Sequence, residues 1–268
     1  MLELKVLRVY HSGDKEAKKL LPYIKECDLF CSEEAFLTEE AAARVEAELQ
    51  LKYKGSRTNF HNWASTLLQN DNEQERAYLL RKFDYLYVSK VPVWHLERFT
   101  DEEARKAREY MNKAETLMNE AGRKLEKGHI EECVKMYFDG MKIELEGVRY
   151  RDDHIGGNIS IMDQKVRQIY PSISDQRQLR VAMDIGGLHR PDKYTSMLLT
   201  MIDLRGKPEN PIQALWYDFD EHKTLEEMKR LILARCLWAI FQNSPQKHKA
   251  QNLMDLSFDE LSSIARND

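Results

Sequence analysis

Short apolar runs alternate with longer amphipathic stretches through the first hundred residues of the chain. The runs at 4–11, 27–33 and 91–97 are short and rich in β-branched or aromatic residues, which predicts three buried strands. Apolar positions at helical spacing predict helices between and beside them. These helices span 14–26, 37–53, 58–69 and 73–83. Because a helix connects the first two strands, they are expected to pair in parallel through a right-handed crossover.

The pattern changes at residue 100. Residues 100–148 carry opposite charges three or four positions apart beside one narrow apolar stripe, which is typical of two antiparallel helices; the turn is expected at Gly128. The remaining pattern predicts a mixture of elements. It predicts helices at 149–170, 191–202, 224–243 and 257–265, a strand at 179–187 and a loop at 207–215.

These elements predict an α/β fold: a small mixed or mostly parallel central sheet with many surrounding helices and a helical-hairpin insertion. The sequence predicts a single α/β domain over 1–268, with 100–148 as a helical excursion within it. Three roles are open for this hairpin: a lid over a sheet-edge site, a contact arm in a homodimer, and a plain packed hairpin.

Charge and composition exclude several partners. The net charge of -4 predicts binding neither to nucleic acid nor to an anionic membrane surface. No apolar run approaches the roughly 20 residues that span a bilayer, and the N-terminus does not read as a signal peptide. A cytoplasmic location is therefore expected.

The cysteines fit no zinc ribbon, CxxC redox pair or disulfide framework, so reduced packing thiols are expected. They are Cys27, Cys31, Cys133 and Cys236.

Imidazoles and carboxylates follow the predicted strands, at the edge where open α/β sheets form their sites. These residues are His11, Glu33, Glu34, His95, Glu97 and His189. Two imidazoles with carboxylates suit a divalent metal such as zinc, manganese or cobalt, and a free glutamate then serves as general base. The sequence therefore predicts His11, Glu33 and His189 as metal ligands, with Glu33, Glu34 and Glu97 as catalytic carboxylates. Without a metal, the same groups suit acid–base catalysis.

The stretch "RDDHIGGNI" (151–159) adds candidate catalytic side chains. At helical spacing, Arg151 and Asn158 share one face. Arg151 is expected to hold a substrate carboxylate or to orient a ligand glutamate, and Asn158 to donate a hydrogen bond to an oxyanion. Glycine is unfavourable inside a helix, so Gly156 and Gly157 predict the close approach of another backbone.

The order of these motifs resembles the Tiki/TraB/erythromycin-esterase-like superfamily, which has ChaN-like haem-binding relatives. The resemblance spans about residues 4–200. It rests on "RVYH" (His11), "CSEEAF" (Glu33, Glu34), "VPVWHLERF" (Glu97), "RDDHIGGNI" (Arg151, Asn158) and "GGLH" (Gly186, His189). It implies a mixed α/β core with catalytic residues at one sheet edge. Arg8 stands where the family's first motif has glycine, and His154 and Ile155 stand where bulky apolar residues are usual.

The resemblance leaves the reaction open, because some members look like metal-dependent peptidases, others like esterases, and others bind haem. The leading hypothesis is a metal-assisted hydrolase of peptide or ester bonds with a small-molecule or peptide substrate. The alternative is a haem- or small-molecule-binding protein, or a regulatory protein with a vestigial site. The carboxylates favour the hydrolase, because haem ligation needs only an accessible histidine or tyrosine.

Overall fold

The structure is a computed structural model. It describes residues 2–11, 13–33, 37–69, 73–173, 178–186, 188–189, 198–208, 210–242 and 247–267. Contacts divide the chain into two compact units. The first unit contains Met1–Arg105 and Tyr150–Arg205, and the second contains Lys106–Arg149 and Gly206–Asp268. The single domain expected over 1–268 stays a prediction.

The first unit is built around a parallel sheet. Among the described residues, five strands pair in the order β4-β2-β6-β1-β7. They are β1 (Leu2–Val9), β2 (Leu29–Ser32), β4 (Val93–His95), β6 (Leu179–Gly186) and β7 (Leu198–Asp203). All these pairings are parallel, which confirms the α/β fold in its mostly parallel form. A separate parallel pair joins β3 (Leu37–Thr38) to β5 (Arg98–Phe99).

The register aligns the carboxyl ends of the central strands. Ser32 at the end of β2 pairs with His95 of β4 and with Asp184 of β6. Val9 at the end of β1 pairs with Gly186 at the end of β6. The residues that follow these strands therefore emerge at one edge of the sheet.

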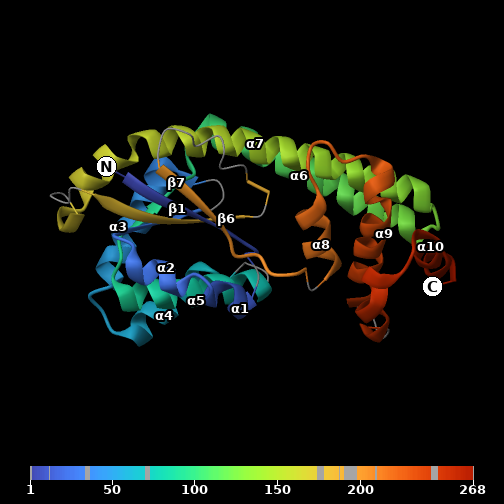
Figure 1. Ribbon diagram of the computed structural model, residues 1–268, viewed down its shortest axis with the longest axis horizontal. Coiled ribbons are helices and arrows are strands. Elements are labelled where there is room, and N and C mark those ends of the chain that lie inside the picture. Colours follow the sequence, from blue (N-terminus) through green and yellow to red (C-terminus); the bar gives the residue numbers. More distant parts are fainter. Residues whose placement is uncertain are drawn as a thin grey trace. The chain divides into compact units, whose positions relative to one another are not determined.

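Helices cover both faces of this sheet (Figure 1). One face packs against helices from the first ninety residues. They are α1 (Gly13–Lys18), α2 (Leu21–Glu26), α3 (Glu39–Lys52), α4 (Arg57–Leu67) and α5 (Glu73–Ser89). The other face packs against the C-terminal part of a long helix, α7 (Ile130–Ile169). The side chains of β1 point to both faces of the sheet and so contribute to both hydrophobic cores. Leu4 and Val6 pack in the core that includes α7, whereas Leu7 and Val9 pack in the core on the opposite face.

The helix predicted over 14–26 is in fact two short helices. Pro22 lies in the first turn of α2, where its missing N–H costs nothing, but the ring disfavours a continuous helix across that point. The helix predicted over 37–53 begins after a side-chain cap, because the hydroxyl of Thr38 accepts a hydrogen bond from the Ala41 amide at 3.2 Å.

The predicted helical hairpin is confirmed as α6 (Asp101–Glu126) followed by α7. Gly128 has φ 74°, and the His129 amide donates to the Lys124 carbonyl at 2.9 Å, which completes a glycine-based helix cap. The boundary expected at 148–149 was wrong. Helix α7 is 40 residues long and continues across this position, because no proline or helix cap interrupts the sequence there. It ends at Ile169, before Pro171, as expected; the short 3-10 helix η1 (Pro171–Ile173) follows.

The second unit also contains helices from the C-terminal part of the chain. They are α8 (Pro211–Asp218), α9 (Leu225–Gln242), the 3-10 helix η3 (Lys247–Asp255) and α10 (Phe258–Asn267). The predictions for 224–243 and 257–265 are thereby confirmed. No helix in the described ranges combines the length and apolar content that a membrane crossing requires.

Two predictions after residue 190 were wrong. The loop expected at 207–215 contains the start of α8, because the Asn210 side chain accepts from the Gln213 amide at 2.9 Å and Pro211 follows in the first turn. The helix expected at 191–202 is contradicted at its end by β7, since pairing with β1 takes up the apolar run there. Residues 191–197 lie outside the described ranges.

Candidate functional site

Three predicted site residues meet at the aligned strand ends. Glu33 directly follows β2, Glu97 lies between β4 and β5, and His189 lies shortly after β6. Each offers one ligand atom, and these atoms all lie within 4.8 Å of one another. Glu97 and His189 are buried, and the Glu33 side chain is only 8% exposed. We call these three residues the carboxylate–imidazole cluster.

Arg151 of α7 joins two of the cluster's carboxylates. Its Nη2 donates to Glu33 Oε1 at 2.6 Å, and its Nε donates to Glu97. Burial opposes the positive charge, but the two carboxylates raise the pKa of Arg151 above its ordinary value. The expected pairing of Arg151 with a glutamate at the site is confirmed.

His189 lies between two carboxylates. Its Nδ1 lies 2.6 Å from Asp152 Oδ1, and its Nε2 lies 2.8 Å from Glu33 Oε1. Burial lowers the pKa of His189, but these carboxylates outweigh burial and raise it to about 10. Both ring nitrogens therefore carry protons at neutral pH. Asp152 was missed from the sequence; its position next to Arg151 in "RDDHIGGNI" was the available signal.

The environments of the two glutamates push their pKa values apart. Burial raises the pKa of Glu33, but the charges of His189 and Arg151 outweigh burial and hold it well below its usual range. Burial raises the pKa of Glu97, and Arg151 offsets only part of that rise. Glu33 is therefore the permanent anion, and Glu97 is the carboxylate better suited to take up and release a proton.

The predicted ligand His11 lies beside the cluster and is not one of its three members. Its ring stacks on Tyr78 with centroids 5.1 Å apart, and its Nε2 is buried without a hydrogen-bond partner among the described residues. Burial lowers the pKa of His11, although the charge of Glu33 acts in the opposite direction. His11 is therefore a neutral imidazole next to the cluster, and its role as a ligand stays a prediction.

A second buried polar network lies next to His11. Asp184 Oδ2 accepts from the Tyr78 hydroxyl at 2.8 Å and from Lys82 Nζ at 3.1 Å, and Lys82 also donates to Ser32 Oγ at 2.7 Å. Asp184 and Lys82 are almost completely buried, so the ion pair neutralises charges that would be costly alone. One sign of this network is present in the sequence, since Tyr78 and Lys82 lie four positions apart on α5.

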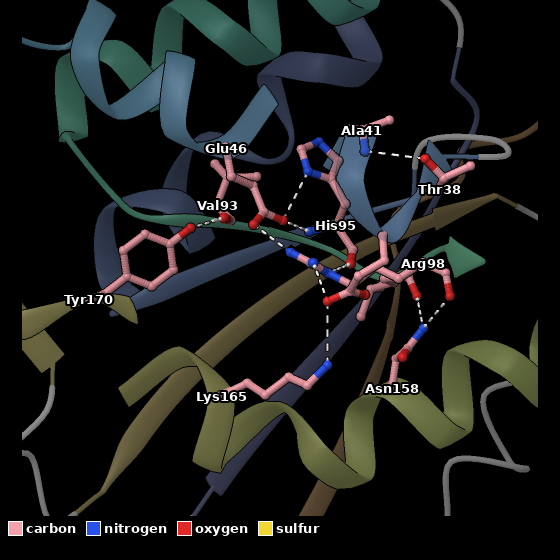
Figure 2. Close-up of polar contacts among 11 residues, drawn as sticks. Thr38, Ala41, Glu46, Val93, His95, Arg98, Asn158, Lys165 and Tyr170 are labelled. Atoms are coloured by element: carbon pink, nitrogen blue, oxygen red, sulfur yellow. Dashed lines mark hydrogen bonds and ion pairs between the residues drawn. The ribbon is translucent and has the colours of Figure 1, made fainter. Parts of the chain in front are cut away.

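The segment that carries Glu97 is held from two helices, as Figure 2 shows. From α7, Asn158 Nδ2 donates to the Leu96 carbonyl at 2.8 Å. From α3, Glu46 accepts from the His95 amide at 2.7 Å and from the Arg98 guanidinium. Asn158, which was expected to bind an oxyanion, directs its amide to the protein backbone in this structure and so positions Glu97.

The remaining sequence predictions for the site have mixed outcomes. Gly186 allows a close approach, because its amide donates to Glu33 and an added Cβ would lie 3.4 Å from that carboxylate. A Cβ at Gly157 would meet no atom within 4 Å, so the backbone approach expected there was wrong. Arg8 lies in β1, paired with Asp203 of β7. Glu34 lies outside the described residues.

Comparison of the chain with protein-family models, with curated proteins and with solved structures found no match. The resemblance to the Tiki/TraB/erythromycin-esterase-like superfamily therefore stays a prediction that rests on the quoted motifs.

Proposed function

We propose that the protein is a metal-assisted hydrolase of peptide or ester bonds. In this proposal Glu33, Glu97 and His189 hold a divalent metal such as zinc, manganese or cobalt, and His11 is the neighbouring candidate for a further ligand. The proposal is carried by one observation: the ligand atoms of the three residues lie within 4.8 Å of one another at the strand ends of an α/β sheet.

The chemistry of the donor groups fits a divalent metal. Carboxylate oxygens and imidazole nitrogens are both zinc ligands, and Asp152 holds the other nitrogen of the His189 imidazole, as carboxylates do beside metal-bound histidines. With His189 neutral, the carboxylates of Glu33, Glu97 and Asp152 exceed the single charge of Arg151 by two. A divalent ion matches that excess.

A proton on His189 occupies the place that the metal would take. The Nε2 atom now faces Glu33 Oε1 at 2.8 Å, an interaction that a proton bridges. A metal bound by both residues must displace this proton, so the two compete for the site. The buried Nε2 of His11, which lacks a hydrogen-bond partner among the described residues, supports the fit.

The side chains have distinct roles in this proposal. A bound divalent metal polarises the substrate carbonyl and lowers the pKa of bound water. Glu97 must lose its proton to bind the metal, and burial, which raises its pKa, makes this loss less favourable than for Glu33. Arg151 orients both glutamates. Glu34, predicted as a catalytic carboxylate, belongs to the same proposal, as does the expected cytoplasmic location.

A second candidate function has its own observation. Arg151 already pairs with both glutamates and His189 with two carboxylates, so the cluster satisfies its charges without a metal. That arrangement suits a vestigial site in a regulatory protein or in one that binds haem or another small molecule.

Metal content and hydrolysis distinguish the two candidates. Purified protein would be loaded separately with zinc, manganese and cobalt, analysed for bound metal, and assayed on p-nitrophenyl esters and fluorogenic peptides. We expect one metal per chain and metal-dependent hydrolysis that Glu97→Gln abolishes. Glu221→Gln removes an ion-paired carboxylate from the second unit and serves as the control. A Soret band from bound haem, or the absence of both metal and hydrolysis, would favour the second candidate.

A further inference from the structure

Two cysteines face each other in the second unit. Cys133 of α7 and Cys236 of α9 are 103 residues apart in sequence, and their sulfur atoms lie 3.8 Å apart. Both side chains are buried within one apolar cluster. The other two cysteines contact different groups: Cys27 bonds to the Ile24 carbonyl, and Cys31 contacts the Met162 sulfur. The contact between Cys133 and Cys236 is therefore specific to this pair and independent of the carboxylate–imidazole cluster.

The distance between the two sulfur atoms is short enough for a disulfide to form with small local movements. A disulfide bond is about 2.05 Å long, so the sulfur atoms must approach by less than about 2 Å. Rotation of the two side chains about their Cα–Cβ bonds changes the distance between the sulfur atoms without movement of the backbone. The chain needs no large rearrangement to join these two residues.

A cavity gives small molecules access to one of the two thiols. It has a volume of about 730 Å³ and is lined by residues of α6, α7 and α9, including Met118, Tyr137 and Cys236. Cys236 is 6% exposed, whereas Cys133 is completely buried. An oxidant that enters the cavity therefore meets Cys236 first, with Cys133 directly behind it.

We propose that Cys133 and Cys236 are a reversible oxidation site, where a hydroperoxide entering through this cavity converts two thiols into a disulfide between α7 and α9. The Cys236 thiolate attacks the peroxide, the O–O bond breaks, and hydroxide or alkoxide leaves. The Cys133 sulfur then attacks the resulting sulfenic acid, so that the S–S bond forms, the S–O bond breaks and water leaves with the thiol proton. The two thiols supply the two electrons that reduce the peroxide.

The environment of the pair sets the conditions of the reaction. The hydrogen bond with Cys133 and burial both raise the pKa of the Cys236 thiol, so little Cys236 thiolate is present at neutral pH. The same hydrogen bond lowers the pKa of Cys133. Access from the cavity, and not acidity, therefore makes Cys236 the attacking thiol. We therefore expect oxidation to be slow near pH 7 and faster at pH 8.5. A slow reaction is consistent with thiols that stay reduced until peroxide accumulates.

The test uses the full chain with Cys27→Ala and Cys31→Ala, so that only the pair remains. The folded protein would be treated with hydrogen peroxide at pH 8.5, denatured, alkylated with N-ethylmaleimide and weighed by mass spectrometry. We expect both alkylations to be lost together. Both should return when the oxidised protein is reduced with dithiothreitol before alkylation. Proteolysis of the oxidised protein should yield two peptides joined through residues 133 and 236. Circular dichroism before and after oxidation checks that the protein stays folded.

Two control variants separate the proposal from random oxidation. With Cys133→Ala, Cys236 should stop at sulfenic acid, which dimedone traps as a single adduct. With Cys236→Ala, the completely buried Cys133 should stay alkylatable after denaturation. The proposal is overturned if the folded protein with both cysteines keeps two alkylatable thiols after peroxide treatment, or if its disulfides join different chains.

Discussion

The protonation of His189 depends on two neighbouring carboxylates. Asp152 lies on one side of the imidazole and Glu33 on the other, and together they hold a proton on each ring nitrogen. We predict that Asp152→Asn lowers the pKa of His189 from about 10 toward neutrality, because it removes one charge partner. NMR titration of the imidazole measures the shift. Asp153→Asn, an exposed neighbour on α7, should leave it unchanged; an equal shift in both variants would contradict the assignment.

The same proton makes stability depend on pH. The folded-state pKa of His189, about 10, lies above its unfolded value of 6.5, so protonation stabilises the fold. This contribution is complete below pH 6.5 and is lost as the pH rises through 10. We predict that metal-free protein loses a few kcal/mol of stability over this range. Urea unfolding measures it, and Asp152→Asn should lose less. A stability that does not fall between pH 6.5 and pH 10 would argue against a charged His189.

The sequence identified much of the cluster because strand ends determine where a backbone emerges. Glu33, Glu97 and His189 each follow a recognisable strand, and Arg151 lies in a distinctive helical motif. The sequence did not identify Asp152 as the partner of His189. That detail depends on side-chain direction and burial, which the spacing of residues along one chain does not determine. The role of His11 as a ligand stays a prediction.

Side chains from α7 and α3 hold the segment that carries Glu97, and we call these contacts the Glu97 brace. Their contribution to stability and to metal binding can be measured by substitution. Asn158 of α7 donates to the buried Leu96 carbonyl, and removal of this partner leaves a polar group unsatisfied. We predict that Asn158→Ala costs about 1–3 kcal/mol of stability and weakens metal binding. Chemical denaturation and calorimetry measure the two effects. Asn62→Ala, on the exposed surface of α4, should change neither, and a normal metal affinity in Asn158→Ala would show that the brace does not position Glu97.

The packing of α6 on α7 depends on glycine at one position of α7 and not at another. A Cβ at Gly147 would lie 2.8 Å from the Cβ of Tyr110 on α6, whereas a Cβ at Gly157 would meet no atom within 4 Å. We predict that Gly147→Ala destabilises the protein by about 1–3 kcal/mol through overpacking. Gly157→Ala should stabilise it by roughly 0.5–1 kcal/mol, because alanine favours a helix. Thermal unfolding measures whether each substitution lowers or raises the stability. Equal changes in stability in the two variants would contradict the close packing at Gly147.

Strongly periodic helices and buried strands were predictable, whereas short ambiguous segments were not. The run that ends the segment 191–202 suits a helix or a strand, and pairing with β1 decides in favour of β7. The sequence around Asn210 and Pro211 resembles a loop, but Asn210 caps α8 and Pro211 begins it. The sequence divided helix α7 at 148–149, where the charged hairpin was expected to end, but the backbone continues as one helix.

In the whole chain, the proposed metal site belongs to the first unit alone. Glu33, Glu97, Arg151 and His189 all lie within Met1–Arg105 and Tyr150–Arg205. We predict that metal binding slows amide hydrogen exchange after β2 and after β6, because a ligand that binds only the folded state suppresses local opening. Peptides from α9 and α10 in the second unit serve as the internal reference. Protection confined to those peptides would place the metal elsewhere.

Calorimetric titration of the metal-free protein with zinc, in two buffers of different ionisation enthalpy, tests whether the carboxylate–imidazole cluster is a metal site. We predict one zinc per chain and the release of about one proton from His189. Because this proton must leave, the affinity should rise about tenfold per pH unit below pH 10. Glu97→Gln should weaken binding at least about tenfold, and Glu221→Gln should bind like the wild type. Zinc binding that is independent of pH and unchanged by Glu97→Gln, or no binding at all, would contradict the assignment.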